Sequence, residues 1–166
     1  GESGLDYFRT ADPGREAQKE SFRAHIEMAA RHDLPLQIHD REAHEDSIAL
    51  VRECANPDQR IVFHCFSGDA AMASVLTEHG WYASFAGPIS YPANEDLRQA
   101  FAVLPRELVL VETDAPYLTP LPWRGCPNAS YVMAHTVRFI ADLWGVSEEE
   151  ACTQLRENTE RVYGSW

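Results

Sequence analysis

The sequence predicts an α/β fold, an incomplete (β/α)8 TIM-type barrel with about four to five parallel strands and flanking helices. Three observations predict it. Short apolar runs alternate with longer amphipathic segments, the connections between them are short, and acidic or histidine motifs stand where apolar runs end. In α/β barrels the catalytic groups come from the carboxyl ends of several strands, so motifs far apart in sequence meet at one mouth.

The first half of the chain is predicted to contain a strand stub, two helices and two strands. The stub ends at Glu2. Residues 16–31 have the apolar spacing of an amphipathic helix, and residues 35–39 form the next strand. Residues 42–54 form a second helix, and residues 60–65 are a short β-branched strand.

The second half repeats this alternation. A helix over residues 69–79 ends at Gly80, which suits a left-handed C-terminal cap. A strand over 81–86, a helix over 94–104 and a strand over 107–112 follow. Short connections between such elements imply parallel strands joined by right-handed crossovers.

The chain is predicted to close with two helices. Residues 131–144 form a long helix, and Ser147 opens a capping box for a last helix that runs to about residue 157. A short turn holds Val162 and Tyr163. Four full strands and a stub are too few to close an eight-stranded barrel, which typically needs about 250 residues.

The composition is that of an ordinary folded protein, and we expect residues 1–166 to form a single domain. The chain is 45% hydrophobic and 24% charged, without an apolar run near the roughly 18 residues of a membrane span. No signal peptide and no membrane partner are expected. The four cysteines are scattered, which favours free thiols in a reducing compartment, and the predicted location is cytoplasmic.

The formal net charge of −12 limits the choice of partner, because nucleic-acid binders usually carry a basic face. An acidic enzyme can still act on a polyanion where bound divalent cations neutralise the mouth and a few arginines contact phosphates. Weak and transient substrate binding would follow.

Four residues at strand ends are candidate metal ligands: Glu2, His39, His64 and Asp114. A single strand-end histidine is more often structural, but two on separate strands with an aspartate on a third favour a metal. Glu2 is either a solvated terminal acid or a carboxylate that bridges two cations. The mixed nitrogen and oxygen ligands fit Mg²⁺, Mn²⁺ or Zn²⁺ without selecting one.

Asp114 is the main candidate for chemistry, since a carboxylate at a barrel strand end can ligate metal and accept a proton from the attacking water. Its alternative is a turn aspartate. Arg41 and Arg124 could hold a phosphate or pair with surface acids. Ser67 precedes a helix and could present backbone amides to an anion or act as a plain cap. His44 could support a ligand or touch substrate.

Together these motifs resemble the TatD family of metal-dependent deoxyribonucleases, within the barrel metallohydrolase class. The match runs nearly from end to end of the chain. It rests on Gly1-Glu2-Ser3-Gly4-Leu5-Asp6, Ile38-His39-Asp40-Arg41, Phe63-His64-Cys65-Phe66-Ser67-Gly68, Glu112-Thr113-Asp114-Ala115-Pro116 and the Arg124-Gly125 loop.

The resemblance implies a (β/α)8 barrel, two divalent metals and hydrolysis of phosphodiester bonds in DNA, commonly as an exonuclease from a 3′ end. It makes Glu2 the bridging and catalytic carboxylate, and His39 and His64 the ligands of the second metal. Asp114 then ligates the first metal and activates water. Arg124 and Asn128 belong to a substrate-binding loop, in which Ala129 stands where the family commonly has proline.

One departure from the family lies at the front of the chain. The His-x-His pair that the family carries on its first strand occurs nowhere in this sequence, so the chain resembles the C-terminal two-thirds of the family. We therefore expect one weakly bound metal or none, on the His39 and His64 side. Uncovered strand edges predict self-association.

Two other functions stay open at this point. A related hydrolase could cleave another ester or amide, such as an aminoacyl-tRNA bond, which suits an acidic protein better. A truncated scaffold that self-associates without catalysis is the third reading. Single-stranded DNA or DNA 3′ ends are the expected substrate for the first function.

Overall fold

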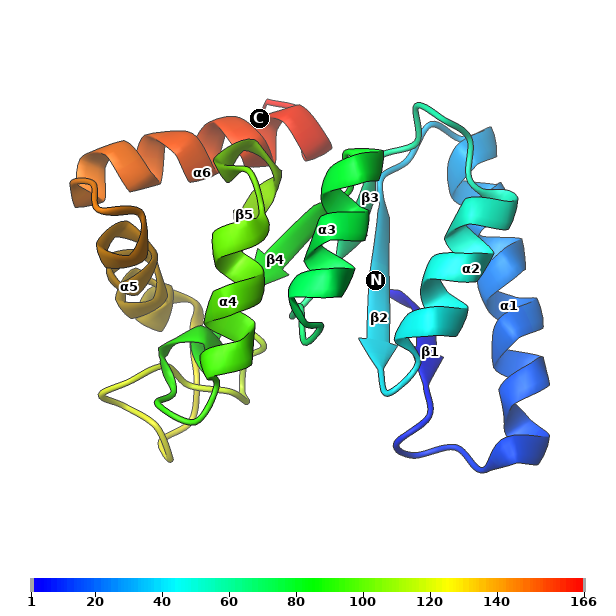
Figure 1. The fold of residues 1–166 in the computed structure, drawn as a ribbon, viewed down its shortest axis with the longest axis horizontal. Coiled ribbons are helices and arrows are strands. Elements are labelled where there is room, and N and C mark those ends of the chain that lie inside the picture. The colour runs from blue at the N-terminus through cyan, green and yellow to red at the C-terminus, as the bar shows by residue number, and fades with distance from the viewer. Residues whose placement is uncertain (1, 166) are drawn as a thin grey trace. The chain divides into compact units, whose positions relative to one another are not determined.

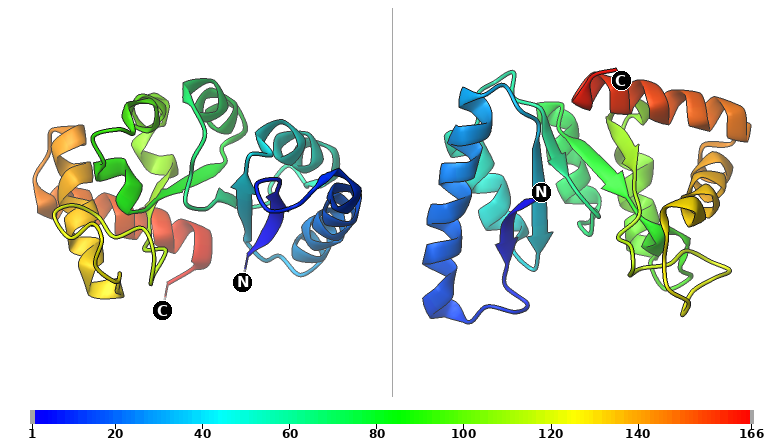
Figure 2. Two further views of the ribbon diagram at one scale, coloured as in Figure 1. Left: turned by 90° about the horizontal axis from the view of Figure 1, so that it is seen from below. Right: turned by 180° about the vertical axis from the view of Figure 1, so that it is seen from behind.

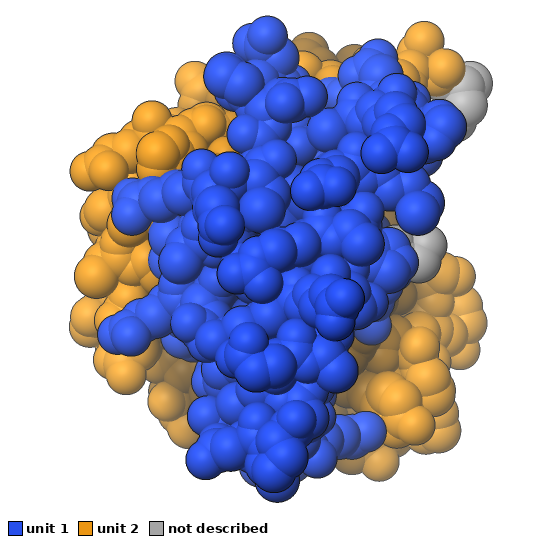
Figure 3. Space-filling model, turned by 90° about the vertical axis from the view of Figure 1, so that its right-hand side faces the viewer, with its two compact units in different colours: residues 1–67 blue, residues 68–166 orange. Residues whose placement is uncertain are grey.

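Five strands and six α-helices alternate in the computed structural model of this protein, which describes residues 2–165 (Figure 1). The chain divides into two units, Gly1–Ser67 and Gly68–Trp166, which Figure 3 colours separately. We call them unit 1 and unit 2. Gly1, the first residue of the opening motif, lies outside the described residues. That the whole chain forms one domain stays a prediction.

Unit 1 is a three-stranded parallel arrangement with β2 in the middle. β2 pairs with β1 in the register Gly4 to His39 and with β3 in the register Ile38 to Phe63. The elements in chain order are β1 (Ser3–Asp6), α1 (Asp12–Arg31), β2 (Leu36–Arg41), α2 (His44–Cys54) and β3 (Ile61–Phe63). Parallel pairing with a helix in each connection is the βα repeat that the sequence predicts.

The core of unit 1 forms where α1 and α2 pack side by side and against β1 and β2 (Figure 2). Phe22 and Ile26 of α1, Val51 of α2, Leu5 of β1 and Ile38 of β2 have no exposed surface. Burial of each such side chain stabilises a fold by roughly 1.5–3 kcal/mol. The strands that carry the site are therefore held by packing as well as by backbone hydrogen bonds.

Gly4 allows β1 to approach β2 very closely. Its φ is +147°, and a Cβ at this position would lie 2.0 Å from the backbone oxygen of His39. Any other residue would both strain the backbone and collide with β2. The close approach occurs at the level of His39, next to the candidate metal ligands.

Unit 2 contains a second parallel pair, β4 with β5, in the register Ser84 to Leu110. Its elements are α3 (Ala70–His79), β4 (Tyr82–Phe85), η1 (Gly87–Ser90), α4 (Glu95–Val103), η2 (Arg106–Leu108), β5 (Val109–Val111), η3 (Ser130–Val132), α5 (Met133–Trp144) and α6 (Glu148–Tyr163). Phe85 and Phe101 meet edge to face in the core, with ring centroids 5.0 Å apart. Aromatic pairs prefer this geometry.

Asn158 joins α6 to the start of β5. Its side chain is fully buried, and its amide nitrogen donates to the backbone oxygens of Arg106 and Val109, each at 2.7 Å. The Asn158 Oδ1 atom accepts from Gln154 and Arg161. A buried amide with every contact made is a strong tether, because leaving such groups unpaired is costly.

Two helix caps confirm their sequence signals. The Ser147 side chain accepts from the Glu150 N–H at the start of α6, and Gly80 ends α3 with φ +66°. Asp69, rather than Ser67, caps the start of α3 by accepting from the Met72 N–H. No helix in the described residues is long and apolar enough to cross a membrane.

Several boundary predictions are wrong. The first strand does not end at Glu2. It begins after it, because the Gly4 contact lets residues that read as a glycine-rich loop pair with β2. The last helix runs to Tyr163 instead of about residue 157, because the buried side chain of Val162 continues the packed face of α6 through a polar stretch.

The strand predicted over residues 107–112 is shorter than expected. A 3-10 turn, η2, occupies Arg106–Leu108, and β5 starts only at Val109. The parallel α/β prediction itself is confirmed by all the strand pairs described above.

Candidate metal centre

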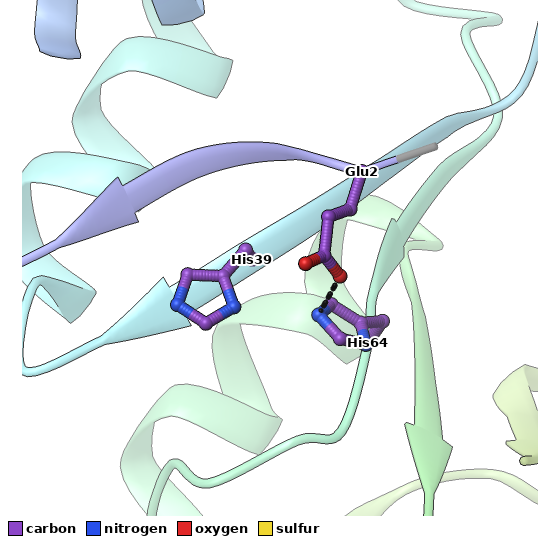
Figure 4. Close-up of side chains that lie close together, drawn as sticks. All are labelled: Glu2, His39 and His64. Carbon is purple, nitrogen blue, oxygen red and sulfur yellow. Dashed lines mark ion pairs between the residues drawn. The ribbon is translucent and has the colours of Figure 1, made fainter. Parts of the chain in front are cut away.

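Glu2, His39 and His64 come together in unit 1 (Figure 4). Glu2 directly precedes β1, His39 lies within β2, and His64 directly follows β3. Each residue offers one ligand atom, and these atoms all lie within 4.8 Å of one another. This is the three-residue set that the family resemblance assigns to the second metal.

Strand register explains why these side chains meet. Gly4 pairs with His39, which places Glu2 beside β2, and the His64 N–H continues the β2–β3 ladder by donating to the Ile38 oxygen at 3.0 Å. The His39 and His64 rings lie 5.7 Å apart, centroid to centroid. The staggered register of the parallel strands thus brings the three side chains together.

The burial of the cluster is uneven. The His64 side chain is 8% exposed, whereas the Glu2 side chain is 49% exposed. The Glu2 Oε2 atom lies 2.5 Å from His64 Nε2. One buried ring with a carboxylate that faces solvent gives a site with a fixed side and an open side.

The donor set fits a divalent cation. Two imidazoles and a carboxylate suit Zn²⁺ or Mn²⁺, and the carboxylate suits Mg²⁺. Ligand atoms at about 2.1 Å from a metal lie up to about 4.2 Å apart. The observed spread within 4.8 Å therefore requires only small side-chain rotations.

Asp6, the last residue of β1, contacts one member of the cluster, His39. Its Oδ2 atom lies 3.3 Å from His39 Nε2. Partial burial opposes ionisation of Asp6, but hydrogen bonds from the Arg9 N–H and from His39, with the charges of His39 and Arg41, outweigh it. The pKa of Asp6 is therefore lowered below its usual value.

A second acid and histidine pair follows on β2 and α2. Asp40 Oδ2 lies 2.8 Å from His44 Nδ1, and the Asp40 side chain is only 5% exposed. The other Asp40 oxygen, Oδ1, is buried and has no hydrogen-bond partner among the described residues. His44 thus contacts an acid next to a candidate metal ligand, and its supporting role stays a prediction.

Sequence reasoning missed Asp6 and Asp40 as parts of this site. Both lie in the motifs that contain predicted ligands: Asp6 is four residues after Glu2, and Asp40 directly follows His39. The signal that was missing is the position of the first strand. Once Ser3–Asp6 is known to be β1, Asp6 is recognised as a polar residue at a strand end.

Asp114 lies in unit 2, three residues after the end of β5, and is partly exposed. Its backbone oxygen accepts from the Tyr117 N–H at 2.7 Å, so it begins a turn. The turn agrees with the alternative considered for it, and its roles as metal ligand and proton acceptor stay predictions.

Arg41 and Ser67 lie in unit 1 with the cluster. Arg41 is the last residue of β2, and its guanidinium carbon lies 3.8 Å from the centroid of the Phe8 ring. The Ser67 hydroxyl donates to the Asp40 backbone oxygen at 3.4 Å. Arg41 keeps an exposed charge that suits a phosphate, while substrate contact by either residue stays a prediction.

Arg124 and Asn128 lie in the long connection of unit 2 between β5 and η3. The Arg124 guanidinium carbon lies 4.3 Å from the centroid of the Tyr91 ring, a cation–π contact. Asn128 is buried, and its side chain bonds within the loop itself. It donates to the Tyr117 oxygen and accepts from the Ala129 N–H. It shapes the loop, and its predicted substrate contact remains untested.

The same connection and the start of η3 expose large aromatic side chains. Tyr117 is 70% exposed, Trp123 51% and Tyr131 82%. The Trp123 indole N–H donates to His135 Nε2 at 2.9 Å, which orients the ring. Residues 115–131 contain no Asp or Glu, in a chain with 26 acidic residues. We call residues 115–131 the aromatic loop.

The fold and the cluster define a class. Parallel βα repeats with metal-ligand side chains on or next to the strands are typical of α/β-barrel proteins with a metal centre. Within that class, the chain belongs to the TatD related DNase family, whose family model matches residues 1–164.

Curated relatives agree with this assignment. The chain is 41% identical over 171 residues to the "Uncharacterized metal-dependent hydrolase TatD" of Mycobacterium tuberculosis, covering 99% of this chain and 63% of that protein. It is 37% identical over 163 residues to the "Uncharacterized metal-dependent hydrolase YcfH" of Escherichia coli K12, covering 98% and 61%. The chain thus spans less than two thirds of these relatives.

Solved structures confirm the barrel-type fold. The crystal structure of YJJV, a TatD homologue from Escherichia coli K12, matches with a TM-score of 0.91 and 30% identity, over all of this chain and 63% of that one. A hydrolase TatD family protein from Entamoeba histolytica matches with a TM-score of 0.83 at 20% identity, over 99% of this chain and 63% of that one. The second likeness concerns the fold alone.

Proposed function

We propose that this protein is a metal-dependent hydrolase that cleaves phosphodiester bonds of DNA, removing nucleotides from 3′ ends with Mg²⁺ or Mn²⁺. The observation that carries the proposal is the convergence of Glu2, His39 and His64 ligand atoms within 4.8 Å. Membership of the TatD related DNase family supports the reaction type. The names of the relatives support a metal-dependent hydrolase.

Glu2, His39 and His64 would hold the cation. A divalent cation bound there supplies charge to polarise a phosphoryl oxygen and lowers the pKa of water. His64, buried and fixed by β3, provides the rigid side of the site, and Glu2 provides the solvent-facing side. Asp114 is proposed to take the proton of the attacking water, as a carboxylate at a strand end can do.

The aromatic loop supports a single-stranded nucleic acid as the substrate. Exposed aromatic rings stack on bases without regard to sequence, and a nearby arginine can pair with phosphate. Tyr117, Trp123 and Arg124 offer these groups on a stretch that lacks acidic residues. The loop thereby avoids the repulsion that a net charge of −12 would otherwise impose on DNA.

Digestion of a labelled oligonucleotide tests the proposal. A single strand labelled at its 3′ end is incubated with the chain and Mg²⁺ or Mn²⁺, beside His64→Ala, Asp114→Asn and a chelator control. We expect the label to be released by the parent alone and to be protected by the chelator. Equal release by parent and both variants would attribute the activity to a contaminant and contradict the proposal.

A second substrate in the same assay separates the alternatives. Cleavage of an aminoacyl ester, with DNA left intact, would select the other hydrolase reading. We also propose that the chain self-associates. Light scattering on the same preparation measures its oligomeric state, and a stable monomer would contradict self-association.

A further inference from the structure

We propose that Asp6 is a positioning residue that holds the His39 ring so that Nδ1, not Nε2, is the nitrogen offered to a metal. The inference rests on the metal centre proposed above. It concerns Asp6, an acid that is not among the predicted ligands and that contacts His39 Nε2.

The first step is that Asp6 itself is held from several directions. The Gln18 side chain of α1 accepts from the Asp6 N–H at 2.8 Å and donates to the Asp6 backbone oxygen at 3.2 Å. The Arg9 N–H donates to Asp6 Oδ1 at 3.0 Å. One carboxylate oxygen is therefore occupied, and the backbone is fixed on both sides.

The second step is that the remaining oxygen meets one nitrogen of His39. Asp6 Oδ2 lies 3.3 Å from His39 Nε2. A carboxylate accepts hydrogen bonds only, so His39 must carry a proton on Nε2 for this bond to form. In a neutral ring the lone pair then lies on Nδ1, which is the form that can bind a metal.

The third step is the direction of the ring. In Figure 4 one nitrogen of His39 is directed toward Glu2 and His64, and the other is directed away from them. The nitrogen directed toward Glu2 and His64 is bonded to the ring carbon that carries Cβ, so it is Nδ1, and Nε2, which contacts Asp6, is the one directed away. Metal-bound histidines commonly donate their second N–H to a carboxylate, which fixes the tautomer and raises ligand basicity.

The arrangement joins α1 to the metal centre through one short chain of contacts. Gln18 holds the Asp6 backbone, Asp6 holds His39 Nε2, and His39 faces Glu2 and His64. The role assigned to Asp6 is therefore the choice of tautomer and ring direction, and it does not require Asp6 to touch the metal.

The experiment reads the tautomer first, in the metal-free protein. Long-range ¹H–¹⁵N NMR of the His39 ring, assigned with His39→Gln, distinguishes the Nε2–H tautomer from the Nδ1–H tautomer. We expect the Nε2–H form to predominate in the parent and a mixture to appear in Asp6→Asn and Asp6→Ala. Asp46→Asn removes one acid of the same unit that pairs with Lys19, and should leave the tautomer unchanged.

The second readout is metal affinity, measured by titration calorimetry with Mn²⁺ and with Zn²⁺. Loss of a carboxylate behind a metal-bound histidine typically weakens binding about 10–100-fold. We expect this loss for Asp6→Ala, a smaller loss for Asp6→Asn, and none for Asp46→Asn. Circular dichroism checks that each variant is folded.

The two proposals fail in different ways. If the parent binds no metal, the proposed function fails, while the tautomer measurement still decides the role of Asp6. If the parent binds metal, but tautomer and affinity are unchanged in both Asp6 variants, the role of Asp6 is overturned. Should both Asp6 variants unfold, Gln18→Ala loosens the same contact from a distance, and an unchanged His39 tautomer there would overturn the inference.

Discussion

Unit 1 and unit 2 are built from the same parallel βα repeat, yet they position polar side chains by different means. In unit 1 the candidate ligands stand on or beside paired strands, so backbone register fixes them. In unit 2 the candidates follow β5 on a long connection without helix or strand, which side chains such as Asn128 hold in shape. A residue on or next to a strand can be recognised from sequence more readily than a loop shaped by individual side chains.

The largest expected effect separates metal binding from chemistry. His64→Ala should weaken Mn²⁺ binding by more than the roughly 10–100-fold that loss of a supporting carboxylate causes. Asp114→Asn, in unit 2, should abolish hydrolysis and leave most of this affinity in place, because the clustered ligands are all in unit 1. Calorimetric titration of both variants checks this. Equal loss of affinity would break the distinction between the units.

The next effect concerns the stability of unit 2. Asn158→Ala should lower the free energy of unfolding by about 2–3 kcal/mol, because it removes the side-chain donor to the buried Val109 oxygen and one of the two donors to the Arg106 oxygen. Urea denaturation followed by fluorescence measures the change. Glu157→Ala, an exposed position on the same helix, is the control and should change stability little. Similar values for the two variants would show that α6 is not tethered through Asn158.

A third prediction tests whether the aromatic loop contributes to substrate binding without the metal. Trp123→Ala should weaken binding of a short single-stranded oligonucleotide by about 1–3 kcal/mol, the usual range for one stacked base. Fluorescence anisotropy in the presence of chelator measures this. An abasic strand of equal length is the control, because it should bind parent and variant alike. Equal loss on both strands would assign Trp123 a structural role.

The smallest effect tests a polar contact that holds unit 1 together. The pKa of Asp46 is lowered, first by the hydrogen bond from Lys19 and then by that from Tyr7. A lowered folded-state pKa contributes stability above the unfolded value of 3.8, and the contribution is lost as pH falls through the folded value. Parent and Asp46→Asn should therefore differ in stability at pH 7 and converge below about pH 4. A pH-independent difference in urea midpoints would contradict this.

Much of the metal cluster could be predicted from the sequence because its signal is local. A histidine directly after or at the end of an apolar run is visible without knowing the fold, and both His39 and His64 were found in this way. The first strand was predicted to end at Glu2 instead of beginning after it, because its pairing depends on Gly4 fitting against the His39 backbone, a contact between residues far apart in sequence.

Other features depend on contacts between individual atoms, which a sequence pattern does not describe. The roles of Asp6 and Asp40 follow from which oxygen faces which ring nitrogen. The buried amide of Asn128 depends on where the loop folds back to Tyr117. The end of α6 was placed too early because one buried residue, Val162, carries its final turn. Packing and hydrogen bonding between distant residues decided each of these cases.

The close approach at Gly4 also bears on the thermodynamics of metal loading. A steric contact between main chains sets the spacing of β1 and β2, so the places of Glu2 and His39 do not depend on an ion. Loading such a preformed site buries almost no new apolar surface. Since a negative heat-capacity change marks apolar burial on binding, the enthalpy of metal uptake by unit 1 should vary little with temperature. On this proposal the paired strands hold Glu2 and His39 in place before any cation binds.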